Sequence, residues 1–408
     1  MSERVLGFED ALCEVLARAR ALERVPAVET VELLRGAARV LAASVVADRD
    51  QPGFDRATRD GYAVRAADVA EALRVVGSVR AGESWASEAL GLGGAIEIMT
   101  GAPLPAGADA VVMVEHTALA EGVLRVEAGR SLRVGENVVP RGAESRAGDV
   151  VLPVGRVMGA AEIGVAASCG VSEVRVFARP KVAIVATGDE LVELDEPMSA
   201  AQIRNSNSYA LAALVEAAGG VAERLAIARD NVGELRAQIA EGREADLLVL
   251  SGGVSMGKFD LVEQVLGEFG AEFFFTGALI QPGKPIVFGR LRSEKGWTYF
   301  FGLPGNPVSA QVCFLLFVAP MLRALAGRSE IAPVFVEARL AEDVRGGAKV
   351  TRFLPAEVSG SWEGVAVRVV GWQGSGDVVA NARGNGYVVL PAGVEAFAAG
   401  ETVRVLLR

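Results

Sequence analysis

Residues 180–191 read Pro-Lys-Val-Ala-Ile-Val-Ala-Thr-Gly-Asp-Glu-Leu, a continuous apolar run followed by a small, acidic loop. An uninterrupted apolar run of this length, Val182 to Ala186, predicts a strand that is buried on both faces. The region around it alternates in the same way, with strands expected at 221–228, 246–250 and 298–301 and helices at 206–218, 232–242, 261–269 and 307–325. Buried strands that alternate with amphipathic helices favour a parallel sheet covered by helices on both faces.

The rest of the chain has a different pattern of apolar residues. Apolar spacing predicts helices at 8–22, at about 30–46 and at 157–168, and short alternating runs between Gly and Pro residues predict β-rich modules. We therefore expect a multidomain α/β plus β protein with four parts: an extended and helical N-terminal domain (1–48 and 140–177), an inserted β-rich domain (49–139), a three-layer α/β/α domain with a mostly parallel sheet (178–328) and a C-terminal β-barrel-like domain (329–408).

The composition excludes several classes of function. The 408 residues carry a net charge of −10, which disfavours a nucleic-acid or anionic-membrane partner. The single histidine, His116, excludes a zinc site built on several histidines. Three widely spaced cysteines form no CxxC pair, which favours a reducing cytoplasm. We expect no signal peptide and no membrane span, because the longest apolar run, Val312 to Leu322, is about half of the length that crosses a bilayer.

The loops that follow the expected strands are rich in glycine and acids. Paired glycines let backbone N–H groups approach an anion, and the N-terminus of a following helix favours negative charge. Carboxylates beside such loops would repel an anion unless a cation lay between them. Glu190, Asp230 and Asp260 therefore suggest Mg²⁺, which prefers oxygen ligands and bridges to phosphate, and Lys284 adds a cation on a Pro-rich turn. If the sheet is parallel, these loops meet at one edge.

The same residues also have a structural interpretation. Three pairs have the pattern of a helix N-terminus: Asp260 with Glu263, Asn231 with Glu234, and Asn306 with Pro307. Glu190 would then be a solvated loop acid. The convergence of four such loops at one sheet edge favours a ligand site over capping alone.

One motif points to a different class of enzyme. Residues 253–257, Gly-Val-Ser-Met-Gly, follow an expected strand and match the G-x-S-x-G nucleophile elbow of serine hydrolases. That arrangement needs a histidine base later in the chain than Ser255, and the single histidine, His116, comes before it. The motif is therefore better explained as part of the glycine-rich loop.

Taken in order, the motifs resemble those of the molybdopterin molybdenumtransferases, the family of MoeA and the gephyrin E domain. The similarity runs from about residue 8 to 400 and is carried by these segments: Phe54-Asp55 with Asp60-Gly61-Tyr62-Ala63-Val64-Arg65, Met99-Thr100-Gly101-Ala102-Pro103-Leu104-Pro105 through Asp109-Ala110-Val111-Val112, Thr187-Gly188-Asp189-Glu190-Leu191, Ser251-Gly252-Gly253-Val254-Ser255 to Asp260, Pro282-Gly283-Lys284-Pro285, and Gly302-Leu303-Pro304-Gly305-Asn306-Pro307-Val308-Ser309.

The resemblance implies the last step of molybdenum cofactor assembly. In that step, adenylylated molybdopterin and molybdate react with Mg²⁺-dependent cleavage of a phosphoanhydride and release of AMP. The resemblance also implies a cytoplasmic homodimer, with the active cleft between the α/β domain of one subunit and the inserted domain of the other. A molybdopterin adenylyltransferase is a further expected partner.

The resemblance also implies a role for each matching residue. The expected metal or water-positioning acids are Glu190, Asp230 and Asp260, and Lys284 is the cation that neutralises phosphate charge. The phosphate cradle is expected to consist of Ser251, Gly252, Gly253, Ser255 and Gly257, and the molybdate or pterin pocket of Gly302, Pro304, Asn306, Pro307 and Ser309. The other subunit is expected to contribute Asp55, Asp60 and Thr100, and Arg352 is an expected substrate contact.

Two other functions stay open at this point. The first is a molybdopterin adenylyltransferase-like enzyme, a class that resembles the α/β domain alone and would consume ATP with free molybdopterin. The second is a catalytically inactive scaffold of the gephyrin type, which would bind the pterin tightly without releasing AMP.

Overall fold

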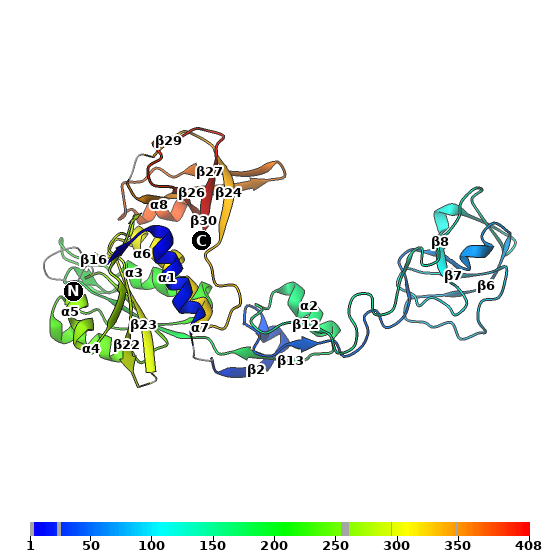
Figure 1. Ribbon diagram of the computed structural model, residues 1–408, viewed down its shortest axis with the longest axis horizontal. Coiled ribbons are helices and arrows are strands. Elements are labelled where there is room, and N and C mark those ends of the chain that lie inside the picture. Colours follow the sequence, from blue (N-terminus) through cyan, green and yellow to red (C-terminus); the bar gives the residue numbers. More distant parts are fainter. Residues whose placement is uncertain (1–3, 23–25, 254–260, 295, 347–348) are drawn as a thin grey trace.

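The computed structural model describes residues 4–22, 26–253, 261–294, 296–346 and 349–408. The molecule is elongated (Figure 1). The α/β domain and the C-terminal barrel lie together at one end, the inserted β-rich domain lies at the other end, and a narrow segment joins them. The chain crosses this segment twice, and its two passes are linked by an isolated bridge between Gln51 and Ser145.

A six-stranded sheet forms the centre of the α/β domain, as expected. Its four parallel strands are β17 (Val221–Arg224), β14 (Lys181–Ala186), β18 (Leu247–Ser251) and β23 (Gly296–Leu303), in that spatial order. Two antiparallel strands complete it, β22 (Val287–Ser293) and β19 (Glu272–Phe275). The sequence between 270 and 297 looked irregular, so these last two strands were not expected.

Helices cover both faces of the sheet. On one face lie α4 (Val232–Gly242) and α5 (Leu261–Glu268), whose buried residues join Val185, Leu248 and Leu250 in one core. The other face carries α3 (Ser206–Ala217), α1 (Phe8–Arg20) and a continuous helix made of α6 (Pro307–Cys313), η4 (Phe314–Val318) and α7 (Ala319–Leu325). The helix α1 was expected in the extended N-terminal domain, but its buried face packs in this core.

The helix Pro307–Leu325 is long and apolar enough to cross a membrane by length and composition, and 72% of its most apolar window is buried. Phe314 and Phe317 are almost completely enclosed, and the ring of Phe317 lies 6.1 Å from that of Phe275. A helix that is apolar all round is expected where neighbours cover every side. Its composition is therefore explained by its place between the sheet and α1.

The narrow segment consists of short two-stranded ribbons and one helix. In it, β2 (Val28–Glu32) pairs with β13 (Glu173–Phe177), β3 (Val45–Val46) pairs with β12 (Val150–Leu152), and α2 (Ala160–Ser168) packs beside them. The expected helix at 30–46 is wrong, since only the short η1 (Leu33–Gly36) is helical there. The strand at 28–32 is stabilised by its pairing with β13, which lies far away in sequence, so local apolar spacing does not reveal it.

Both remaining domains are built from β-strands. The inserted domain is one six-stranded sheet in the order β8 (Ala110–Met113), β5 (Gly61–Val64), β7 (Gly94–Ile98), β6 (Leu73–Val79), β10 (Val123–Val126) and β9 (Thr117–Ala120). The C-terminal domain is a closed barrel of β26 (Thr351–Ser361), β27 (Gly364–Val369), β24 (Phe335–Leu340), β30 (Thr402–Leu407) and β28 (Gly386–Leu390), closed by pairing of β28 with β26.

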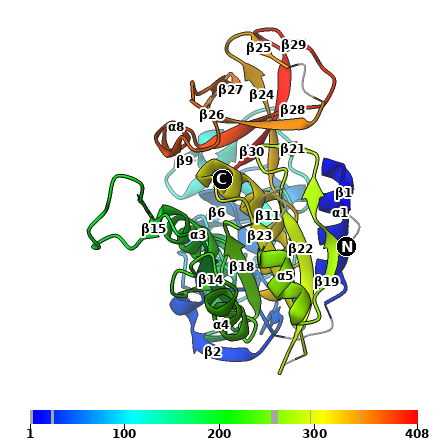
Figure 2. The same cartoon turned by 90° about the vertical axis from the view of Figure 1, so that its left-hand side faces the viewer.

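Short elements complete the domains. They are β1 (Val5–Leu6) with β20 (Gly277–Ala278), β4 (Arg56–Ala57) with β11 (Val138–Val139), β15 (Leu191–Val192) with β16 (Ile203–Arg204), β21 (Ile280–Gln281) with β26, β25 (Val344–Arg345) with β29 (Ala396–Phe397), and the helix α8 (Val378–Arg383). Figure 2 shows the barrel above the central sheet and the β15–β16 turn projecting to the side.

Candidate functional site

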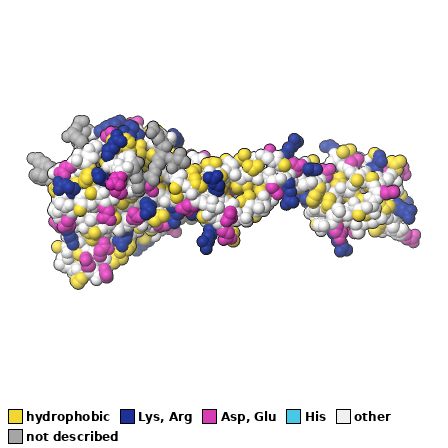
Figure 3. Space-filling view, turned by 90° about the horizontal axis from the view of Figure 1, so that it is seen from below, with side chains coloured by type: hydrophobic (Ala, Val, Ile, Leu, Met, Phe, Trp, Pro, Cys, Tyr) yellow, Lys and Arg dark blue, Asp and Glu magenta, His cyan; other side chains and the backbone are white. Residues whose placement is uncertain are grey.

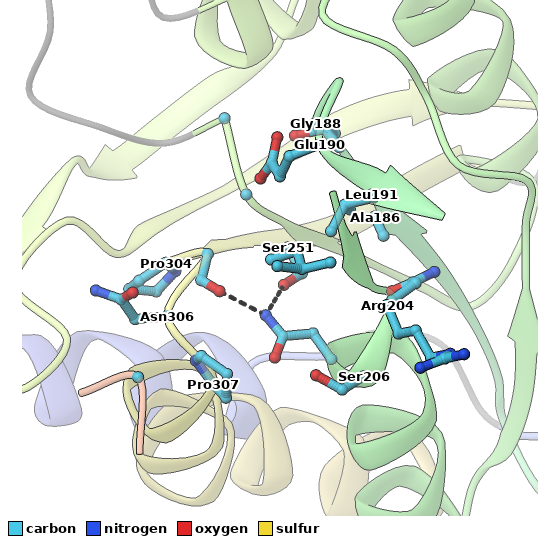
Figure 4. A pocket seen from close by; sticks show the side chains of 18 of the residues that line it. Ala186, Gly188, Glu190, Leu191, Arg204, Ser206, Ser251, Pro304, Asn306 and Pro307 are labelled. Carbon is cyan, nitrogen blue, oxygen red and sulfur yellow. Dashed lines mark hydrogen bonds between the residues drawn. The ribbon is translucent and has the colours of Figure 1, made fainter. Parts of the chain in front are cut away.

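A cavity of about 620 Å³ lies at the carboxyl ends of β14, β18 and β23 (Figure 4). Its walls are the loops that follow these strands, the start of α3, and two residues that follow the barrel strand β27, Gly376 and Val378. Parallel pairing explains this convergence, because strands that run in the same direction end at the same edge of the sheet. The expectation that the polar loops gather at one edge is confirmed.

The cavity brings together many of the residues that the sequence singled out. Those that line it are Glu190, Asp230, Ser251, Gly252, Gly253, Pro304, Asn306 and Pro307. Three others, Ser255, Gly257 and Asp260, lie outside the described residues. The convergence supports a ligand site, while the individual roles given above stay predictions.

Acidic side chains gather at one end of the cavity. Burial is the main cause that raises the pKa of Asp230 above its ordinary value of 3.8, and the negative charges of Asp189 and Glu190 raise it further. No cation in the described part of the chain acts against that rise. Neighbouring Arg229 donates instead to the backbone carbonyls of Asp189 and Leu191, at 3.0 and 2.8 Å. Neighbouring carboxylates without a cationic side chain between them fit a divalent cation with oxygen ligands.

The described residues do not form a complete metal site on their own. Within the described ranges, no group of three or more His, Cys, Asp or Glu side chains could hold a metal ion. Glu190 and Asp230 are the two carboxylates that line the cavity, and the predicted third ligand, Asp260, belongs to the residues that are not described. The Mg²⁺ site therefore stays a prediction.

Glycines bring the loop backbones close together around the acids. Gly252 has a φ of +96°, and a Cβ there would lie 2.5 Å from the carbonyl oxygen of Thr187. A Cβ at Gly188 would lie 2.6 Å from the carboxylate of Glu190. The Thr187 carbonyl therefore excludes a side chain at Gly252. Gly188 has a φ of +148°, which other residues rarely adopt, and its missing side chain leaves room for the Glu190 carboxylate beside the backbone.

An asparagine that the sequence analysis missed ties two of the loops together. The Asn207 side-chain amide donates to the Ser251 hydroxyl at 3.0 Å and to the Gly305 carbonyl at 2.8 Å (Figure 4). Asn205 caps the same helix, α3, by accepting from the Ser208 N–H. The run Asn205-Ser206-Asn207 at the start of the expected helix was the available signal, because these residue types favour helix N-termini.

Asn231 and Asn306 both stand at the N-cap of a helix, as expected, but only Asn231 makes the side-chain bond of a cap. The Asn231 side chain accepts from the Glu234 N–H at 2.9 Å, as a cap does, but Glu234 returns its bond to the N–H of Arg229 rather than to Asn231. Asn306 precedes α6 without making any side-chain cap bond, and it lines the cavity. Capping therefore does not account for Asn306, which is free to contact a ligand.

Four predicted residues of the α/β and barrel regions do not line the cavity. Gly302 is buried within β23, and Ser309 is buried within α6. Lys284 is exposed beside Pro285, which does line the cavity. Arg352 on β26 pairs in register with Gln281, and its guanidinium donates to the Arg345 carbonyl at 3.3 Å.

The predicted residues of the inserted domain make polar contacts within their own region of the chain. The Asp60 carboxylate accepts from the N–H and the hydroxyl of Thr100, at 2.6 and 2.7 Å, and these bonds lower the pKa of Asp60. Asp55 accepts from the Arg141 N–H at 2.8 Å. Asp60 and Thr100 adjoin β5 and β7 at the far end of the molecule (Figure 1). Within one chain they do not reach the cavity.

Comparisons with known proteins cover almost the whole chain. Residues 6–170 match the family described as MoeA N-terminal region (domain I and II), residues 183–324 match the probable molybdopterin binding domain, and residues 337–407 match the MoeA C-terminal region (domain IV). A molybdopterin molybdenumtransferase of Staphylococcus aureus (strain COL) is 34% identical over 386 residues, which cover 93% of this chain and 90% of that protein.

Other relatives agree with this match. A molybdopterin molybdenumtransferase of Nostoc sp. (strain PCC 7120) is 36% identical over 390 residues, which cover 93% of this chain and 88% of that protein. The crystal structure of the molybdopterin biosynthesis moeA protein from Pyrococcus horikoshii OT3 has a TM-score of 0.79 and 29% identity, and covers 99% of this chain and 100% of that chain.

The raised pKa of Asp230 leads to a pH-dependent prediction. A carboxyl whose pKa is higher in the folded chain than in the unfolded chain lowers stability as the pH rises from the unfolded pKa to the folded pKa, because only the unfolded state ionises readily in that interval, and the full loss remains at higher pH. Asp230→Asn removes that ionisation. We expect the variant to have a higher Tm than the wild type at neutral pH, with the difference shrinking as the pH falls toward 3.8. Calorimetry without divalent cations measures this. A lower Tm at neutral pH, or a pH-independent difference, would contradict the account.

Proposed function

Since the chain belongs to the MoeA family of molybdopterin molybdenumtransferases, we propose that it catalyses the last step of molybdenum cofactor assembly. It takes adenylylated molybdopterin and molybdate, cleaves the phosphoanhydride, releases AMP and leaves molybdenum on the pterin dithiolene. The observation that carries this proposal is the cavity, in which a glycine turn and two carboxylates meet at the ends of parallel strands.

The chain's own residues supply the binding part of this chemistry. The Gly252–Gly253 turn exposes backbone to an anion, and Asn207 holds the Ser251 hydroxyl beside that turn. The start of α3 adds the partial positive charge of a helix N-terminus. Together these groups favour the phosphate groups of the substrate, and Asn306 and Pro307 form the wall opposite the acids.

The acids at the other end of the cavity are proposed to hold a cation beside the phosphoanhydride bond that is cleaved. Glu190 and Asp230 are the residues that would hold Mg²⁺, with Asp260 as the predicted third ligand. When bound, Mg²⁺ supplies the neutralisation of charge that cleavage of a diphosphate requires. Lys284 is proposed to approach the same phosphates from the turn next to Pro285.

We further propose that the active unit is a homodimer with a cleft shared between subunits. The Asp60–Thr100 pair is too far along the molecule to serve the cavity of its own chain (Figure 1). The narrow segment exposes the apolar side chains of Leu34, Val46, Val150 and Val154, and apolar side chains are visible along it in Figure 3. Exposed apolar surface of this kind is typical of a face that another protein covers.

The setting of the enzyme follows from the same proposal. The helix that could span a membrane by composition is largely buried in the core, which supports a soluble protein, and the three cysteines are free, which supports a reducing cytoplasm. A molybdopterin adenylyltransferase would supply the adenylylated substrate. Nothing in the fold favours the chain itself as an adenylyltransferase or as an inactive scaffold.

Removal of one cavity carboxylate tests the assigned chemistry. Glu190→Gln keeps the shape of the side chain and removes its charge, so we expect turnover to fall by at least about tenfold, since electrostatic roles at such sites are worth several kcal/mol. The measurement is AMP release from adenylylated molybdopterin in the presence of molybdate and Mg²⁺. Glu241→Gln, the same change on the exposed part of α4, is the matched control and should keep wild-type turnover.

Two results would count against the proposal. If the wild-type chain releases no AMP while another family member does under the same conditions, the proposed reaction is wrong. If Glu190→Gln turns over as fast as Glu241→Gln, Glu190 does not belong to the reacting site.

Hybrid dimers test whether the cleft is shared. One population carries Glu190→Gln and the other carries Asp60→Asn, and each alone is expected to be nearly inactive. Random exchange of subunits makes about half of the dimers hybrid, and each hybrid has one cleft with both native acids. Mixing is therefore expected to restore about a quarter of wild-type AMP release. A mixture as inactive as its components, or an Asp60→Asn dimer that is fully active, would contradict the shared cleft.

A further inference from the structure

The C-terminal domain supplies part of the cavity wall. Gly376, in the segment between β27 and α8, and Val378, the first residue of α8, line the cavity beside residues of the α/β domain. The Val308 N–H in α6 donates to the Ser375 carbonyl at 3.0 Å, so this segment is bonded to the α/β domain through the backbone. Figure 1 shows α8 above α6, and the two helices are in contact. The wall therefore depends on how the two domains are joined.

A buried asparagine lies at the centre of this joint. Asn381 in α8 is only 2% exposed, and its side-chain amide donates to Gln311 Oε1 in α6 at 3.0 Å. Its side-chain oxygen accepts from the Tyr387 hydroxyl at 2.9 Å and from Arg408 at 2.6 Å. One side chain thus links α6 of the α/β domain with strand β28 of the barrel and with Arg408, which follows β30. A buried amide left without partners is costly, so this network specifies one arrangement.

The segment between the joint and the cavity is braced within the C-terminal domain. The two carboxylate oxygens of Asp377 accept from the N–H groups of Ala380, at 2.9 Å, and Gln373, at 3.0 Å. Gly376 and Val378 are the chain neighbours of Asp377 and line the cavity. A shift of α8 relative to α6 therefore also moves the residues of the cavity wall.

We propose that Gln311 and Asn381 are positioning residues for the transferase reaction. Their hydrogen bond holds residues 375–378 as one wall of the cavity and so sets the affinity for substrate, although neither side chain lines the cavity. This inference rests on the proposed function. A wall that contacts substrate before and during the reaction contributes equally to both states, so its displacement raises KM and leaves kcat nearly unchanged.

The test uses the full-length chain and substitutions of Gln311. Gln311→Met removes the acceptor and keeps the length of the side chain, and we expect KM for adenylylated molybdopterin to rise about fivefold, which is the usual effect of one lost hydrogen bond. The Kd for AMP, measured by calorimetry, should rise in parallel. Gln311→Glu keeps an oxygen acceptor for the Asn381 amide and should restore KM. If Gln311→Met does not fold, Gln311→Asn draws the acceptor back by one methylene and serves the same test.

A matched variant separates positioning from stability. Tyr387→Phe removes a hydrogen bond to the same Asn381 inside the C-terminal domain and leaves the bond to Gln311, so it should lower Tm without changing KM. KM within twofold of wild type in the Gln311→Met variant, or an equal rise in KM in Tyr387→Phe, would overturn the proposal. If the wild-type chain releases no AMP, the proposed function is wrong. The positioning role is then decided by whether the Kd for AMP rises in Gln311→Met and stays unchanged in Tyr387→Phe.

Discussion

The parallel pairing of β14 with β17 and β18, and of β18 with β23, determines where the functional loops meet. The central strands β14, β18 and β23 are largely apolar because helices cover both faces of the sheet, and the polar residues therefore begin where these strands end. One sheet edge thus receives the acids after β14 and β17, the glycine turn after β18 and the proline-rich loop after β23. The cavity is a consequence of strand direction before any contact between these loops is considered.

The same geometry explains why acids and an anion-binding turn lie so close together. Gly188 and Gly252 have no side chain to occupy the space between the loops, so the Glu190 carboxylate can lie beside the backbone. Burial raises the pKa of Asp230, and the negative charges of Asp189 and Glu190 raise it further. A divalent cation bound beside these acids would stabilise the ionised form of Asp230. The closeness of the acids to the glycine turn and the proposed diphosphate chemistry are therefore two consequences of the same arrangement.

Local sequence pattern predicted the features that depend on local physics. The helices α1, α3, α4, α5 and Pro307–Leu325, the parallel strands and the converging loops follow from apolar periodicity and strand direction. The pattern could not reveal β2, because that strand is stabilised by β13, about 140 residues away. It also missed Asn207, whose partners Ser251 and Gly305 are brought near only by the fold, and the wall formed by Gly376 and Val378, which depends on the contact between two domains.

The most direct measurement of the central claim is a crystal structure of the chain grown with AMP, molybdate and Mg²⁺. The account predicts that the phosphate of AMP lies on the Gly252–Gly253 turn and that a metal ion lies between that phosphate and the carboxylates of Glu190 and Asp230. A nucleotide bound elsewhere on the molecule, or a phosphate on the turn with both carboxylates directed into solvent, would contradict it.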